Sequence, residues 1–83
     1  MKLKKNIAIS ETGFVFDPNS GDSFSLNSIG KEILELLKSG ETKENISFHI
    51  LKKYDTDEYT FERNFQDFIE MLNHHNILEN EQA

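Results

Sequence analysis

The sequence predicts an α+β domain of the winged helix-turn-helix type, in which a three-stranded antiparallel β-meander precedes a three-helix bundle. Two patterns lead to this fold class. Apolar and polar residues alternate up to Leu26, as they do in a strand with one buried face. From Ser28 onward the apolar residues follow the spacing of an amphipathic helix. Asn27 and Ser28, both good N-cap residues, mark the point where the pattern changes.

Length and composition indicate a single domain over residues 1–83. The chain has 83 residues and no cysteine, which excludes disulfides and favours a reducing, cytoplasmic setting. The formal charge is -6, and three of the nine basic residues, Lys2, Lys4 and Lys5, stand at the N-terminus. The rest of the chain is therefore strongly acidic and would repel a phosphate backbone. Because no long apolar run occurs, we expect neither a membrane span nor an export signal.

Three strands are expected before the first helix. Alternating residues predict the first strand over residues 4–10 and the second over residues 14–16, which has both of its phenylalanines on one face. Residues 17–22, Asp-Pro-Asn-Ser-Gly-Asp, are the strongest turn signal in the chain. The third strand, residues 23–26, then pairs back on the second.

Two helices joined by a short connection follow. The first is expected over residues 28–38 and ends before Gly40, which can take the left-handed conformation past a C-cap. The second begins at Thr42, a suitable N-cap. Each helix has one apolar stripe, formed by Ile29, Ile33, Leu36 and Leu37 in the first and by Ile46, Ile50 and Tyr54 in the second. The short connection predicts a tight corner between them.

The third helix, expected over residues 58–75, is the longest. Thr56 or Asp57 is the expected N-cap. At about 100° per residue, one narrow sector of this helix carries the apolar side chains that should face the core. These are Phe61, Phe65, Phe68, Ile69 and Leu72. Residues 78–83 are expected to form a frayed acidic tail.

The sequence indicates neither catalysis nor a bound metal or cofactor. His74 and His75 are neighbours on a helix, so their rings point about 100° apart and do not easily share an ion. We expect both to be solvated or to lie at the edge of a groove. The serines lie outside any nucleophile motif, and the four glycines are isolated rather than grouped in a phosphate-binding loop.

A DNA-binding winged-helix regulator is the first alternative, because this architecture commonly reads DNA. A recognition helix needs exposed Arg, Lys, Asn or Gln side chains. The longest helix instead exposes three acidic residues and has Arg63 as its only Lys or Arg residue. The second helix is better supplied, with Lys43, Lys52 and Lys53, but it also carries Glu44. We therefore expect no nucleic-acid partner.

The strand at residues 23–26 offers a place for a peptide to add. A three-stranded meander leaves two strands with an unpaired edge, and an open edge is a template for another strand. On the last helix, Met71 lies outside the core sector, beside Phe68. If this helix lies along the strand, an extended peptide can bond to the strand and place apolar side chains against Phe68 and Met71. An ordinary exposed methionine is the alternative for Met71.

The ordered set of motifs resembles the PqqD-like family, small winged-helix peptide chaperones also described as recognition elements for ribosomally made peptides. The resemblance covers about residues 14–78. Its core consists of Leu26-Asn27, Gly30, Ile33-Leu34 and Leu36-Leu37. Two positions depart from the family pattern: Asn64 stands where Asp is frequent, and Asn76 stands where a Gly commonly closes the last helix.

The resemblance implies a non-catalytic protein that binds the leader of a precursor peptide and presents it to a modifying enzyme, often a radical SAM protein. The leader would add beside the third strand and lie against the last helix. Carried over to this sequence, Ser23, Phe24, Ser25 and Leu26 would supply backbone hydrogen bonds. The pocket wall and its rim would come from Asn64, Asp67, Phe68, Met71 and His75. A docking subunit that never touches a substrate peptide is the second alternative.

Overall fold

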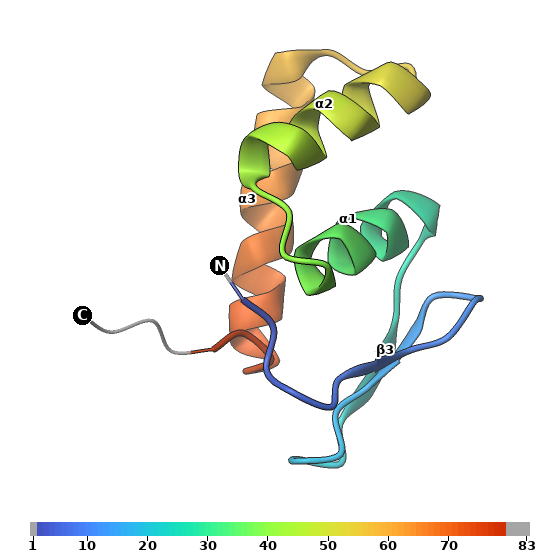
Figure 1. Cartoon of the computed structure of the whole chain (residues 1–83), viewed down its shortest axis with the longest axis vertical. Helices are drawn as coiled ribbons and strands as arrows, with labels where there is room; N and C mark the ends of the chain where they lie inside the picture. The colour runs from blue at the N-terminus through green and yellow to red at the C-terminus, as the bar shows by residue number, and fades with distance from the viewer. Residues whose placement is uncertain (1, 80–83) are drawn as a thin grey trace.

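Three short strands are followed by three helices, as the sequence predicts. The computed structural model describes residues 2–79, and the chain runs through β1 (Ala8–Ile9), β2 (Phe14–Phe16), β3 (Ser23–Ser25), α1 (Ser28–Lys38), α2 (Lys43–Lys53) and α3 (Glu58–His74). The strands form one antiparallel sheet in the order β1-β2-β3. Figure 1 shows the sheet below α1, with α2 at the top of the molecule and α3 running past all of them.

The N-terminal segment corrects the prediction of a strand over residues 4–10. β1 contains only Ala8–Ile9, because Asn6 adopts a φ of 72° that interrupts the extended backbone. Before this kink, Leu3 forms an isolated antiparallel bridge with Leu78. The side chain of Lys38 donates to the carbonyl of Ile7 at 3.0 Å, which ties the segment after the kink to the end of α1.

The C-terminal segment corrects a second prediction, that of a frayed tail over residues 78–83. The amide of Glu79 donates to the carbonyl of Lys2 at 2.7 Å, and the amide of Lys4 donates to the carbonyl of Ile77 at 2.9 Å. Leu78 and Glu79 are thus held by the N-terminal segment. Residues 80–83 of the expected tail lie outside the described residues. The left-handed turn at Asn76, φ 58°, directs the chain into this pairing after α3.

Each helix begins at a capping residue that the sequence predicts. The side-chain oxygen of the cap accepts a hydrogen bond from a backbone amide in the first turn, which would otherwise have no partner. Asn27 accepts from Gly30 at 2.8 Å, Thr42 from Asn45 at 3.1 Å, and Asp57 from Thr60 at 2.7 Å. Only Leu26 separates the Asn27 cap from β3, so the cap also sets the angle between the sheet and α1.

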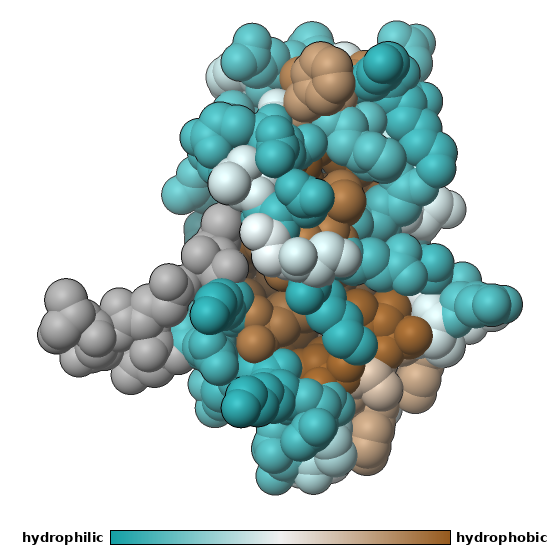
Figure 2. Space-filling view, in the orientation of Figure 1, coloured by the Kyte–Doolittle hydropathy of each residue, from teal (hydrophilic) through white to brown (hydrophobic). Residues whose placement is uncertain are grey.

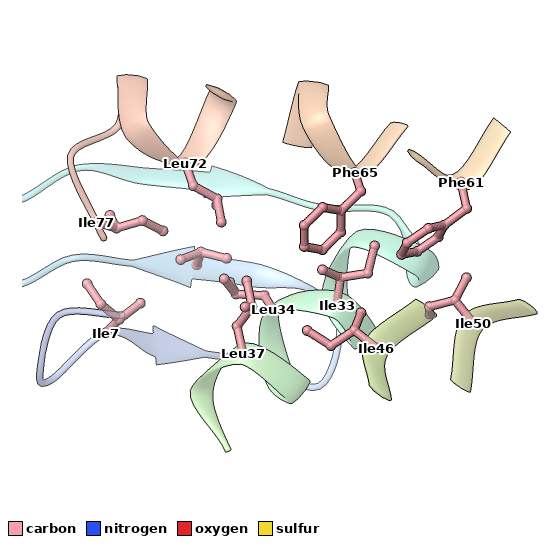
Figure 3. Close-up of a cluster of buried hydrophobic side chains, with 11 residues drawn as sticks. Ile7, Ile33, Leu34, Leu37, Ile46, Ile50, Phe61, Phe65, Leu72 and Ile77 are labelled. Carbon is pink, nitrogen blue, oxygen red and sulfur yellow. The ribbon is translucent and has the colours of Figure 1, made fainter. Parts of the chain in front are cut away.

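The core lies between the sheet and the three helices (Figure 3). Its most buried side chains come from β2, from the three helices, and from the segments just before β1 and just after α3. They are Ile7, Val15, Ile33, Leu34, Leu37, Ile46, Ile50, Phe61, Phe65, Leu72 and Ile77. In Figure 3 the α3 residues point toward those of α1 and α2. Ile29, expected in the apolar stripe of α1, remains 36% exposed, while Leu34 is completely buried.

The two faces of the sheet differ in the way that the pleat of a strand requires. Val15 is fully buried, whereas its neighbours Phe14 and Phe16 are 46% and 41% exposed. The two phenylalanines therefore share one face, as predicted, and this face points away from the core. The helices of residues 2–79 include none that is long and apolar enough to cross a membrane.

Candidate functional site

β3 is an edge strand whose outer side is open. β2 lies on its inner side, and no further strand pairs with it within residues 2–79. The amide of Leu26 donates to the carbonyl of Gly13 at 2.8 Å, so this pair of residues is a hydrogen-bonded one. Hydrogen-bonded and non-hydrogen-bonded pairs alternate along an antiparallel ladder. The backbone groups of Phe24 and Leu26 therefore face β2, and those of Ser23 and Ser25 face outward.

Side chains of β3 and α3 meet on the inner face of the sheet. The rings of Phe24 and His75 are stacked, with centroids 4.2 Å apart and an interplanar angle of 16°. The central residue of β3 is thereby fixed to the end of α3. His74 and His75 lie with their rings nearly perpendicular at 5.6 Å, and residues 2–79 contain no group of three His, Asp or Glu side chains that could hold a metal ion.

Gly30 permits a second close approach, this one between α1 and α3. A Cβ atom on this residue would lie 3.3 Å from the ring of Phe68 and 3.4 Å from the Cβ of Leu26. The distance to the ring is shorter than an ordinary van der Waals contact, and the distance to Leu26 is at the lower limit of one. The glycine shared with the PqqD-like motif is thus the place where the ring of Phe68 packs against the start of α1.

A pocket of about 420 Å³ opens where α1 and α3 face each other. Asn64 and Asp67 of α3 are exposed at this pocket, and Phe68 is half-buried in its wall. The remaining lining comes from Asn27, Ile29, Gly30 and Ile33. The pocket therefore combines apolar side chains with two amides and a carboxylate.

The predicted site residues thus occupy two adjoining places. We call them together the edge site. Its first part is β3 (Ser23, Phe24 and Ser25) with the following Leu26, and its second part consists of Asn64, Asp67, Phe68 and Met71 of α3 with the C-cap His75. Met71 is half-buried and packs against the core cluster. The lining residues Ile29 and Ile33 were absent from the prediction. Their helical spacing assigned both to the core, although Ile29 stands in the first turn of α1, where a helix is least covered.

The charged side chains of α2 are largely paired within the chain. Lys43 binds Glu62 of α3 at 2.7 Å, and Lys53 binds Glu32 of α1. The hydrogen bond from Lys53 lowers the pKa of Glu32, and the same contact raises the pKa of Lys53. Two of the three lysines of α2 are therefore engaged with carboxylates, which leaves this helix poorly suited to bind phosphates.

Comparisons with known proteins agree with this architecture. The family model described as Coenzyme PQQ synthesis protein D (PqqD) matches residues 13–78. Among solved structures, TbiB1 in complex with the TbiA(beta) leader peptide aligns over 100% of both chains, with a TM-score of 0.87 and 27% identity. A lasso peptide synthetase B1 complexed with the leader peptide aligns over 95% of this chain and 96% of that chain, with a TM-score of 0.81 and 18% identity. No curated protein sequence matches.

Proposed function

Because the chain belongs to the PqqD family, we propose that it is a non-catalytic protein that binds the leader of a ribosomally synthesised precursor peptide at the edge site. The observation that carries the proposal is the open side of β3, where the backbone groups of Ser23 and Ser25 point outward. A peptide in extended conformation can pair with them and become a fourth strand. The solved complexes of TbiB1 and of the lasso peptide synthetase B1 with leader peptides support leader binding as the function.

The residues of β3 and the following Leu26 form two sets with different roles in this proposal. Ser23 and Ser25 provide the main-chain donors and acceptors, because the amide of Leu26 already donates to Gly13. Phe24 and Leu26 contribute their side chains instead, on the face that α3 covers. Every second side chain of the leader would therefore point toward α3.

On α3, the half-buried side chains form the apolar part of the contact, and the exposed ones form its rim. Phe68, Met71 and His75 are half-buried and would contact the inward side chains of the leader. Asn64 and Asp67 are exposed at the pocket between α1 and α3. An apolar leader side chain fits this pocket, and the carboxylate of Asp67 favours a basic or hydrogen-bond-donating neighbour at its rim.

The mechanism consists of binding without a chemical step. A leader held by this protein keeps the attached core peptide near the active site of a modifying enzyme, which raises the effective concentration of the substrate. We propose a modifying enzyme as the second partner, from the radical SAM class or, following the lasso peptide synthetase B1 neighbour, from a lasso-forming synthetase.

A calorimetric titration tests the proposal, with a synthetic peptide that spans the leader of the precursor encoded beside the gene. Wild-type protein should bind this peptide, and Phe68→Ala should weaken binding by about tenfold or more, the loss typical of truncating a central aromatic contact. Glu70→Ala is the matched control, because Glu70 is an exposed residue two positions further on the same helix. Unchanged affinity in a folded Phe68→Ala variant would refute the assignment of α3 to the contact.

A further inference from the structure

The outer face of the sheet presents two aromatic side chains whose exposure the core does not explain. Phe14 and Phe16 of β2 are 46% and 41% exposed, although Val15 between them is completely buried. Both belong to the central strand of the sheet, so they lie well inside this face rather than at its rim. We call them the outer aromatic row. Figure 2 shows apolar surface gathered at the level of the strands, below α1.

The strand register places small residues between this row and the open edge. Phe14 lies opposite Ser25, and Phe16 lies opposite Ser23. Directly opposite residues of an antiparallel pair point to the same face of the sheet, so both serines stand on the outer face. Only their hydroxymethyl groups separate the phenylalanine rings from the position of an added strand.

Building on the leader-binding function above, we propose that the outer aromatic row is a second contact surface for the leader. Leader residues that lie opposite Ser23 and Ser25 point to the outer face, because side chains of paired strands share their faces. Large apolar side chains at these positions reach across the serines and cover Phe14 and Phe16. The preferred leader segment therefore has large apolar residues at consecutive positions. A peptide that contacts only α3 would need large apolar residues only at every second position.

Three features favour the leader over a second copy of the chain as the occupant. The row is continuous with the open side of β3, so one strand can fill both. The intervening residues are serines, which leave space for side chains from an adjoining strand. The row contains only two rings and is flanked on its other side by Ala8, opposite Phe16, which makes it narrow for a stable dimer interface.

A phage-displayed library of short randomised peptides tests this inference even where the sequence of the precursor is unknown. The library is selected on wild-type protein, on the double variant Phe14→Thr/Phe16→Thr and on Ser25→Pro. Threonine retains strand propensity at both positions and removes the rings. Peptides that bind the wild type but not Ser25→Pro are the strand-adding ones, because proline removes an outward amide of β3.

We expect the strand-adding peptides from the wild type to carry large apolar residues at consecutive positions. Those from the double variant should carry them at every second position only. A wild-type-selected peptide should bind the double variant about tenfold more weakly, because two aromatic contacts that reach across the serines are lost. Phe48→Thr is the control, since Phe48 is 69% exposed on α2, and it should leave this affinity unchanged.

The possible failures are distinguishable. If the wild type and the double variant select the same alternating pattern, the outer row does not contact the leader, although the proposed function stands. If sedimentation velocity shows a wild-type dimer that the double variant dissociates, the row binds a second copy and the inference is wrong. If no selected peptide depends on Ser25, leader binding at β3 fails and the inference fails with it. If the double variant does not fold, the same selection is carried out on Ser23→Lys/Ser25→Lys, which places charged side chains beside the row. The peptides selected on this variant should then lack large apolar residues at consecutive positions.

Discussion

Ser25→Pro is the most specific single substitution for testing strand addition at the edge site. The backbone groups of Ser25 point away from β2, so the sheet of this protein does not use the amide that proline removes. Proline is tolerated at such edge positions, and it keeps the preceding residue, Phe24, in an extended conformation. We therefore expect a folded protein whose melting temperature is close to that of the wild type, with a defect confined to leader binding.

The size of the defect follows from the hydrogen bond that is lost. One backbone bond contributes about 0.5–1.5 kcal/mol net, which corresponds to roughly a two- to twelvefold change in Kd. The Cδ atom of the proline ring also projects into the space of an added strand, which lies only about 4.8 Å away. Neighbouring bonds are disturbed as well, so we expect Kd to rise by about tenfold or more.

Calorimetry with the synthetic leader measures this effect, and circular dichroism establishes the fold. Ser25→Ala is the matched control, because it keeps the amide and should bind within about twofold of the wild type. Leu26→Pro is the opposite control: its amide donates to Gly13, so this variant should lose stability. A folded Ser25→Pro variant with wild-type affinity would exclude strand addition at β3.

Two further predictions concern the elements that hold the edge site in place. Gly30→Val adds a Cβ that would lie 3.3 Å from the ring of Phe68, and two methyl groups beyond it. We expect this variant to lower the free energy of unfolding by about 1–3 kcal/mol, measured by urea denaturation. An unchanged midpoint would show that Phe68 moves aside freely. Asp17, buried in the turn before β3, accepts hydrogen bonds from the amide of Asn19 and the hydroxyl of Ser20, which lower its pKa. Its carboxylate therefore stabilises the fold above the unfolded pKa of about 3.9, and this contribution is lost as the pH falls through the folded pKa. The stability difference between wild type and Asp17→Asn should shrink between pH 7 and pH 2, and a constant difference would contradict this reasoning.

Local signals in the sequence predicted the helices well. The three N-caps, Asn27, Thr42 and Asp57, act through side-chain oxygens on amides three residues away, and such chemistry depends on few neighbours. The first strand was predicted too long because its extent depends on a distant partner. Residues before the kink at Asn6 pair with the chain after α3, and alternation along the sequence does not carry this information.

The sequence was sufficient to predict which elements form the candidate site. It was less informative about the role of each residue in that site. The open edge of β3 follows from the meander, but the alternation of its free backbone groups depends on the register with β2. The phenylalanines of β2 were placed on one face without an indication that the core lies on the other. Ile29 was assigned to the core because a helical stripe does not reveal which of its turns remain uncovered.

The bridge between Leu3 and Leu78 brings the beginning and the end of the fold to one place. In Figure 1 the blue beginning and the red end of the described chain lie on the left of the molecule, while β3 lies on the right. Adjacent ends of this kind allow a domain to be spliced into a surface loop of another protein or to be circularly permuted. A fusion to a modifying enzyme at this point would leave the strand edge unobstructed, so one polypeptide could both recruit a substrate and process it.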